Sequence, residues 1–134
     1  GSNQETLLIG SGVYSRCGQV EEAISRLQEL LRIVSNDPGW FQTGMLVTML
    51  YWDGQHSEIY DLIGQKIAAS DMDPRVLAIY SILEFKKGNE KKAVEYFVRS
   101  KKNGFNNSRL GIGDEKIKTE ALDILEQIEK ISKS

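Results

Sequence analysis

The chain has few of the residues that build metal sites and covalent links. Its 134 residues include one cysteine, Cys17, and one histidine, His56. A single cysteine cannot form a disulfide within the chain, and a structural zinc site needs about four Cys or His ligands. We therefore expect no metal and no cofactor. The chain is long enough to bury the core of one ordinary domain without such support.

Long hydrophobic runs and a strong net charge are absent as well. No apolar run approaches the roughly 18–20 residues of a membrane-spanning helix, and no charged start with an apolar block predicts a signal peptide. The 17 basic and 19 acidic residues give a net charge of −2, which disfavours nucleic acid and anionic membranes as general partners. Gly1-Ser2 resembles a cloning remnant, so the natural start stays open. We expect a soluble protein in the cytoplasm that does not bind membranes.

The chain does contain a repeated spacing. Gly18 and Gly54 lie 36 residues apart, and Gly88 follows Gly54 by 34. Asp37-Pro38 and Asp73-Pro74 are also 36 residues apart. Each glycine lies between two stretches of helical hydrophobic spacing, which predicts about three helix-turn-helix units. One such unit cannot bury its own apolar face and must stack on a neighbour, so interaction becomes the leading functional hypothesis.

The predicted fold is all-α and forms one domain. Ser57 and Pro74 are typical of a helix N-cap and a first helical turn, respectively. A last helix should cap the stack. The expected helices are about 6–16, 20–34, near 40 to 53, 57–69, from 74 to before 88, 90–101 and 114–132. The expected boundaries are 1–2 tag remnant, 3–36 repeat one, 37–72 repeat two, 73–106 repeat three, and 107–134 linker and capping helix.

Apolar and small residues at helical spacing predict the inward faces of these helices. The expected inward residues are Leu46, Val47 and Leu50 in repeat two, Leu77, Tyr80, Ser81, Ala93, Val94, Phe97 and Val98 in repeat three, and Ile117, Ala121, Leu125, Ile128 and Ile131 in the capping helix.

The series Gly18, Ala23, Leu27 and Gly88, Ala93, Phe97, with prolines closing the unit, resembles the tetratricopeptide repeat over residues 6–103. The resemblance implies a right-handed α-solenoid of about three repeats, in which small residues let the two helices of a repeat pack closely. Those small residues would be Ser11, Ala23, Ser81 and Ala93.

Repeat two departs from this pattern, because Ile59 stands where a small alanine is expected. We expect its helix pair to splay or shift. Three repeats and a closing helix are also similar in layout to type III secretion chaperones that shield translocator proteins.

In tetratricopeptide arrays the first helix of each repeat lines a concave groove. Here the corresponding residues are mostly apolar and aromatic, which favours a protein or peptide segment with hydrophobic anchors as the partner. Arg75 and Lys86 are expected to supply polar orientation at the rim. The predicted groove comprises Phe41, Met45, Thr48, Tyr51, Trp52, Arg75, Ile79, Ile82, Phe85 and Lys86.

Several alternatives to a scaffold or adaptor stay open. The segment 86–109 carries eight basic and two acidic residues, which could contact RNA or an acidic partner. A chaperone for an apolar client and a homo-oligomer through the terminal helices are two more.

Catalysis is not expected. His56 lies between Asp53 and Glu58 in a predicted turn, where a histidine is typically a surface residue, and Cys17 has no histidine near it in sequence. No glycine motif of the phosphate-binding type is present, so we expect that the chain is not an enzyme.

Overall fold

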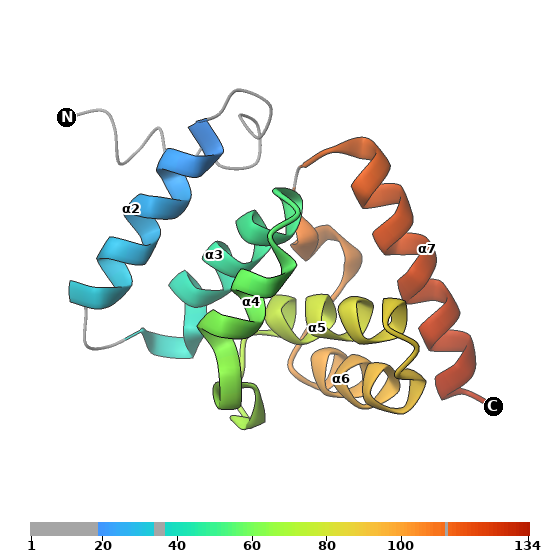
Figure 1. Ribbon diagram of the computed structural model, residues 1–134. Coiled ribbons are helices and arrows are strands. Elements are labelled where there is room, and N and C mark those ends of the chain that lie inside the picture. Colours follow the sequence, from blue (N-terminus) through green and yellow to red (C-terminus); the bar gives the residue numbers. More distant parts are fainter. Residues whose placement is uncertain (1–18, 34–36, 112) are drawn as a thin grey trace.

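The computed structural model, which describes residues 19–33, 37–111 and 113–134, is all-helical, and no strand lies within these ranges. The all-α prediction is confirmed, while the helix expected at 6–16 lies outside the described residues. The α-helices are α2 Gln19–Ile33, α3 Phe41–Trp52, α4 His56–Ile63, α5 Pro74–Lys86, α6 Glu90–Lys102 and α7 Glu115–Ser132 (Figure 1). Short 3-10 segments are η1 Pro38–Trp40, η2 Gly64–Ala68 and η3 Asn107–Leu110.

The helices contact one another largely in chain order. α3 packs against α2, α4 and α5, and the most extensive pairing joins α5 to α6. α7 packs on both α5 and α6, so α2 and α7 lie at opposite ends of the array (Figure 1). One continuous core includes side chains from all six helices. α3 and α5 lie inside it because their apolar residues cover most of the helix circumference and need neighbours on several sides.

Both Asp-Pro pairs precede a helix, and both aspartates bind the free N–H groups at its start. The Asp73 carboxylate accepts from the backbone N–H of Arg75 at 2.8 Å, with Pro74 in the first turn. The Asp37 carboxylate accepts from the N–H groups of Gln42 and Thr43, both at 2.9 Å. It reaches further along the chain because η1 is inserted between Pro38 and α3. Both aspartates therefore bind N–H groups at the start of the next helix, Asp73 two residues ahead and Asp37 five and six residues ahead.

Gly54 and Gly88 follow the ends of α3 and α5, while Gly18 lies outside the described residues. Gly54 has a φ of 76° and Gly88 a φ of 88°, in the left-handed region that glycine adopts without a steric penalty. Glycine therefore recurs at these two positions because the turn after each helix requires a positive φ.

The helix expected at 57–69 has different limits in the structure. α4 begins at His56 and ends at Ile63, because Gly64 leaves the helical region with a φ of 50° and only η2 follows. The N-cap expectation for Ser57 is wrong, since Gln55 precedes the helix and Ser57 lies exposed in its first turn. Backbone bonds from Gln55 and His56 close the preceding turn and start α4 early.

Most expected inward residues are buried, with one clear exception. Val98 is 52 % exposed, because α6 turns Ala93, Phe97 and Ser100 toward the core instead. In α7, Ile117 and Ile131, near the two ends of the helix, are half-buried, while the residues of the expected inward stripe between them are buried. Those covered residues are Ala121, Ile124, Leu125 and Ile128.

Small residues lie at the contact between α5 and α6. Ser81 and Ala93 are fully buried, and the Ser81 hydroxyl donates to the Ala93 carbonyl at 2.6 Å. In repeat two the corresponding position holds Ile59, also fully buried, and its helix pair makes a smaller contact with an α4 of eight residues. Ala23 is buried in α2, and Ser11 lies outside the described residues.

Candidate functional site

The ten predicted groove residues fall into three groups by exposure. Met45, Thr48, Arg75 and Phe85 are half-buried, and Phe41 and Lys86 are exposed. The other four are core residues, which differs from the expectation that they face a groove. These buried residues are Tyr51, Trp52, Ile79 and Ile82.

The chain itself covers the Trp52 end of the predicted groove. The Trp52 indole N–H donates to the carbonyl of Leu110 at 3.3 Å, and Leu110 is fully buried. A Cβ on Gly113 would lie 2.5 Å from two indole carbons, so the glycine backbone lies directly on the ring. The connection between α6 and α7 therefore returns to the end of α3 (Figure 1). Sequence periodicity could not predict this path because the connection has no helical pattern.

Four polar or titratable side chains meet near the same place, each from a different helix. The His56 ring stacks on Tyr51, with centroids 5.8 Å apart and planes at 15°. The Lys86 ammonium pairs with the Glu120 carboxylate at 2.7 Å, joining α5 to α7. Lys86 was expected to orient a partner at the groove rim, and here it binds α7 instead.

This environment shifts the pKa of two of these groups. Burial lowers the pKa of His56, and the Lys86 charge lowers it further, while Glu120 acts in the opposite direction. Burial, assisted by the Glu120 charge, raises the pKa of Tyr51 to about 12. Among the described residues the Tyr51 hydroxyl finds no hydrogen-bond partner. Both groups are therefore uncharged near neutral pH.

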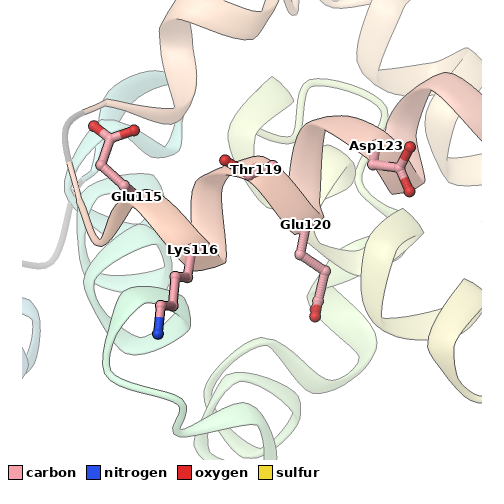
Figure 2. A pocket seen from close by; sticks show the side chains of 5 residues that line it. All are labelled: Glu115, Lys116, Thr119, Glu120 and Asp123. Atoms are coloured by element: carbon pink, nitrogen blue, oxygen red, sulfur yellow. The ribbon is translucent and has the colours of Figure 1, made fainter.

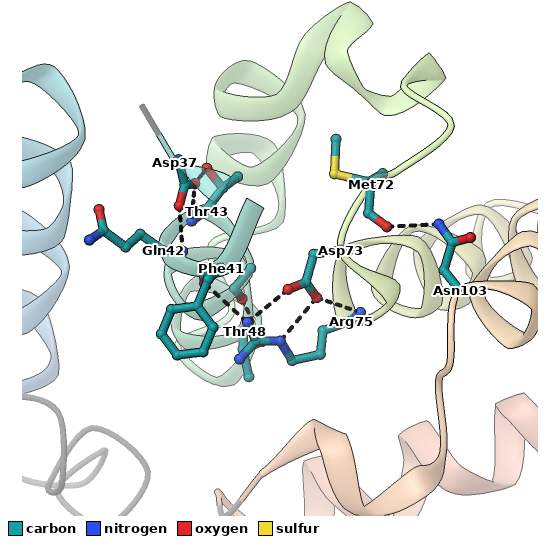
Figure 3. A network of polar contacts seen from close by, with 10 residues as sticks. Asp37, Phe41, Gln42, Thr43, Thr48, Met72, Asp73, Arg75 and Asn103 are labelled. Carbon is teal, nitrogen blue, oxygen red and sulfur yellow. Dashed lines mark hydrogen bonds and ion pairs between the residues drawn. The ribbon is translucent and has the colours of Figure 1, made fainter. Parts of the chain in front are cut away.

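A second polar network joins the beginnings of α3 and α5, as Figure 3 shows. The Arg75 guanidinium donates to both carboxylate oxygens of Asp73 and to the carbonyl of Phe41 at 3.0 Å. The Asp73 side chain is buried and the Arg75 side chain is largely shielded, so solvent screens this ion pair only weakly. Gly44 allows the approach, because a Cβ there would lie 2.5 Å from Cγ of Asp73. Arg75 thus holds two helices together rather than standing free at a rim.

The same network leaves one aromatic ring on the surface. Phe41 is 58 % exposed, and the Arg75 guanidinium carbon lies 5.4 Å from its ring centroid. Met45 and Thr48 follow on the same face of α3, each partly accessible. The Thr48 hydroxyl donates to the Gly44 carbonyl, so this hydroxyl already has a partner within α3. On α3 the accessible part of the predicted groove is therefore segment 41–48, and on α5 Phe85 and Lys86 also stay accessible.

A shallow depression on α7 is lined by side chains from that helix alone (Figure 2). Its residues are Glu115, Lys116, Thr119, Glu120 and Asp123. Since one helix face supplies every wall, the depression cannot enclose a small molecule.

Part of the basic segment 86–109 is engaged in structural contacts. The Lys87 ammonium lies 3.8 Å from the Tyr60 ring centroid. The Arg99 guanidinium donates to the carbonyls of Ile67 and Ala69, both at 2.9 Å. The remaining exposed cations of this segment form no ion pair with the described part of the chain. They are Lys91, Lys92, Lys101, Lys102 and Arg109.

Within the described ranges, no group of three or more Cys, His, Asp or Glu side chains is placed to hold a metal ion. No described helix is both long and apolar enough to cross a membrane. Comparison of the chain with protein-family models, curated proteins and solved structures gave no match. The functional argument therefore depends on this chain's own geometry.

Two residues that shape these sites, Gly44 and Gly113, were not among the expected site residues. Gly44 lies inside a helix, where a glycine costs about 1 kcal/mol relative to alanine, and that unfavourable choice was a signal of close packing. Gly113 lies in a glycine-rich connection, where nothing in the pattern distinguishes a packing residue from a turn residue.

Proposed function

We propose that the chain is a non-enzymatic protein-binding module, built as a tetratricopeptide-like array of helix pairs closed by α7. The support is the succession of contacts from α2 to α3, α3 to α5 and α5 to α7. The close α5–α6 pair, with Ser81 against Ala93, provides further support. An array of this kind presents one face of its first helices to a partner.

The binding surface we propose is the exposed face of segment 41–48 of α3, comprising Phe41, Met45 and Thr48. The observation that carries this proposal is the exposure of Phe41 on a fixed support. The ring is 58 % exposed, yet Arg75 stacks on it and also binds its backbone carbonyl. An aromatic ring held in place loses little conformational entropy on binding, which is typical of an interface anchor.

The partner we propose is a polypeptide segment with an apolar side chain that covers Phe41 and contacts the Met45 thioether. Methionine adapts to differently shaped apolar groups, so the surface suits segments of varied sequence. Arg75 and Lys86 already have intramolecular partners, so the contact depends more on apolar packing than on charge.

Selection of binding peptides from a display library on the wild-type chain tests this proposal. The affinity of selected peptides should fall about tenfold or more for Phe41→Ala, since loss of an aromatic anchor costs more than about 1 kcal/mol. Val98→Ala, which trims an exposed apolar residue on α6, is the matched control and should leave affinity unchanged. Tyr51→Ala is unsuitable because Tyr51 is a core residue.

Circular dichroism should show that both variants keep the wild-type helicity. Peptides that bind wild type and Phe41→Ala equally well would assign their binding to another surface.

A further inference from the structure

The outer faces of α6 and α7 carry complementary residues in the same spacing. On α6, an exposed stripe runs through Lys91, Glu95, Val98 and Lys102, at offsets of 0, 4, 7 and 11 residues. On α7, a stripe with the same offsets runs through Glu115, Thr119, Leu122 and Glu126. Offsets alternating between four and three residues keep side chains on one helix face, as in a helix-pairing seam.

When the two helices are aligned in parallel, each residue of the α6 stripe lies opposite a residue of complementary charge or polarity on the α7 stripe. Lys91 faces Glu115 and Lys102 faces Glu126, so a charge pair stands at each end. Val98 then meets Leu122, apolar against apolar, and Glu95 meets the Thr119 hydroxyl. Leu122 is half-buried and Val98 is 52 % exposed, so both have apolar surface left to cover.

We propose that the α6 face of one copy of this chain docks on the α7 face of a second copy. The α6 face is Lys91, Glu95, Val98 and Lys102, and the α7 face is Glu115, Thr119, Leu122 and Glu126. Within one chain these stripes do not meet, since their charged members are exposed on both helices. Lys91, Lys102 and Glu115 form no ion pair with any described residue, whereas Glu126 pairs with Lys130 of the same helix at 3.6 Å. An exposed pair four residues apart on a helix contributes little, so Glu126 can exchange Lys130 for Lys102.

A polypeptide fits the α6 face better than nucleic acid does. Glu95 lies between the two lysines, where it would repel a phosphate backbone, and Val98 offers an apolar contact that phosphates cannot use. Figure 2 shows the matching side, with Glu115 and Thr119 at the first part of the α7 face.

The association should be weak and sensitive to salt. One helix pair covers less surface than the roughly 1,200 Å² of a small stable interface, so dissociation constants on the order of 10⁻⁵ to 10⁻³ M are expected. The two docking faces differ from each other. Two copies related by a twofold axis would form the contact twice and make an isologous dimer, whereas a heterologous, head-to-tail contact would add copies in a ring or a line.

The experiment is sedimentation of the whole chain over a concentration series at about 0.05 M and about 0.5 M salt, where the Debye length falls from roughly 14 Å to roughly 4 Å. The wild-type mass should rise with concentration at low salt, and association should weaken about tenfold at high salt. Val98→Asp should remove association at both salt concentrations. Lys66→Glu, an exposed lysine outside the α6 face, is the control and should behave as wild type.

Charge reversal makes the test specific. Lys91→Glu with Lys102→Glu gives a chain with two acidic faces, and Glu115→Lys with Glu126→Lys gives one with two basic faces. Each variant alone should stay monomeric, and an equimolar mixture should associate. All four positions are exposed, and circular dichroism verifies that the variants fold.

A wild-type chain that stays monomeric throughout the series would overturn the proposal. So would a mixture that fails to associate while the wild type does so. Salt-sensitive binding of a labelled single-stranded RNA by the monomer, lost in Lys91→Glu with Lys102→Glu, would assign the α6 face to nucleic acid instead.

Discussion

The Gly113 backbone packs against the indole ring of Trp52, so closely that a Cβ at residue 113 would lie 2.5 Å from Cε2 and Cε3 of the ring. The same indole donates its N–H to the carbonyl of Leu110. Two residues of the α6–α7 connection therefore hold one tryptophan of α3. This contact covers the C-terminal end of α3, and the next residue, Asp114, caps the start of α7.

Gly113→Ala should destabilise the fold by about 1–3 kcal/mol, because the methyl group must displace the buried indole or the connection. Urea unfolding measures the change in free energy. Trp52 fluorescence in a Trp40→Phe background reports the displaced ring, since the chain has two tryptophans.

Asn107→Ala is the matched control for that prediction. It places the same residue on the exposed surface of the same connection and should change stability by less than about 0.5 kcal/mol. Equal stability of Gly113→Ala and wild type would mean that Trp52 and the connection do not pack as described.

Gly44→Ala should cost about 1–3 kcal/mol, because its Cβ would meet Asp73 and the Arg75 guanidinium at 2.5 and 2.7 Å. In an Asp73→Ala background the carboxylate is gone and Arg75 can move, so the same substitution should cost less. A double-mutant cycle from chemical unfolding should give a coupling of about 1–2 kcal/mol. Additive effects of the two substitutions would rule out a direct clash between these positions.

Ile59 of repeat two and Ala93 of repeat three occupy corresponding positions, but each site fits only its own side chain. Ile59→Ala should cost about 2–5 kcal/mol, since it removes a fully buried side chain and leaves a cavity between α3 and α4. Ala93→Ile should also destabilise, by about 1–3 kcal/mol or more, because Ser81 contacts its backbone directly. Thermal unfolding checks both values. Tolerance of isoleucine at residue 93 would show that α5 and α6 can separate as freely as the repeat-two pair.

His56 should report how α7 docks. Its pKa is lowered by burial and by Lys86, with an opposing effect of Glu120. Lys86→Gln should therefore raise the pKa, and Glu120→Gln should lower it further. The single histidine of the chain makes its ring signal unambiguous in an NMR titration. Both shifts should shrink in high salt, because the groups involved are partly exposed.

The lowered pKa of His56 also sets the direction of a pH effect. The unfolded chain binds a proton near pH 6.5, whereas the folded chain resists it, so this contribution to stability is complete above about pH 6.5 and is lost as the pH falls. His56→Gln should reduce the slope of stability against pH in that range. An unchanged slope would show that His56 is as accessible to protons in the folded chain as in the unfolded one.

Tyr51→Phe should leave stability at neutral pH unchanged or slightly raised, because the buried hydroxyl has no hydrogen-bond partner among the described residues. At alkaline pH the variant should be more stable than wild type. The Tyr51 pKa is raised to about 12, so its contribution is complete below about pH 10 and is lost as the pH rises through 12. Unfolding midpoints between those pH values measure the difference. Tyr96→Phe, at a half-buried ring, is the control and should shift them less.

The helices could be predicted largely from the sequence because their signals are local. Asp73-Pro74 and Gly88 mark the two ends of α5, and the apolar residues around its circumference mark it as a buried helix. The second apolar face of α3 was also visible in the sequence, but the element that covers it was not. Tyr51 and Trp52 were therefore expected to be accessible to a partner, whereas both are buried, and Leu110 and Gly113, about sixty positions later, pack on Trp52. Contacts of this range depend on the path of a connection, and no periodicity describes that path.

The Trp52–Leu110 hydrogen bond spans 58 residues of the chain, and this separation affects how the array unfolds. In an open stack each unit contacts its sequence neighbours alone, so a terminal unit can fray by itself. Here Leu110 and Gly113, in the connection that leads into α7, pack on Trp52 of α3, so unfolding of this connection together with α7 uncovers Trp52. Amide protons in α7 and in the C-terminal half of α3 should therefore exchange with solvent through one shared opening, and the array should melt as a single cooperative unit.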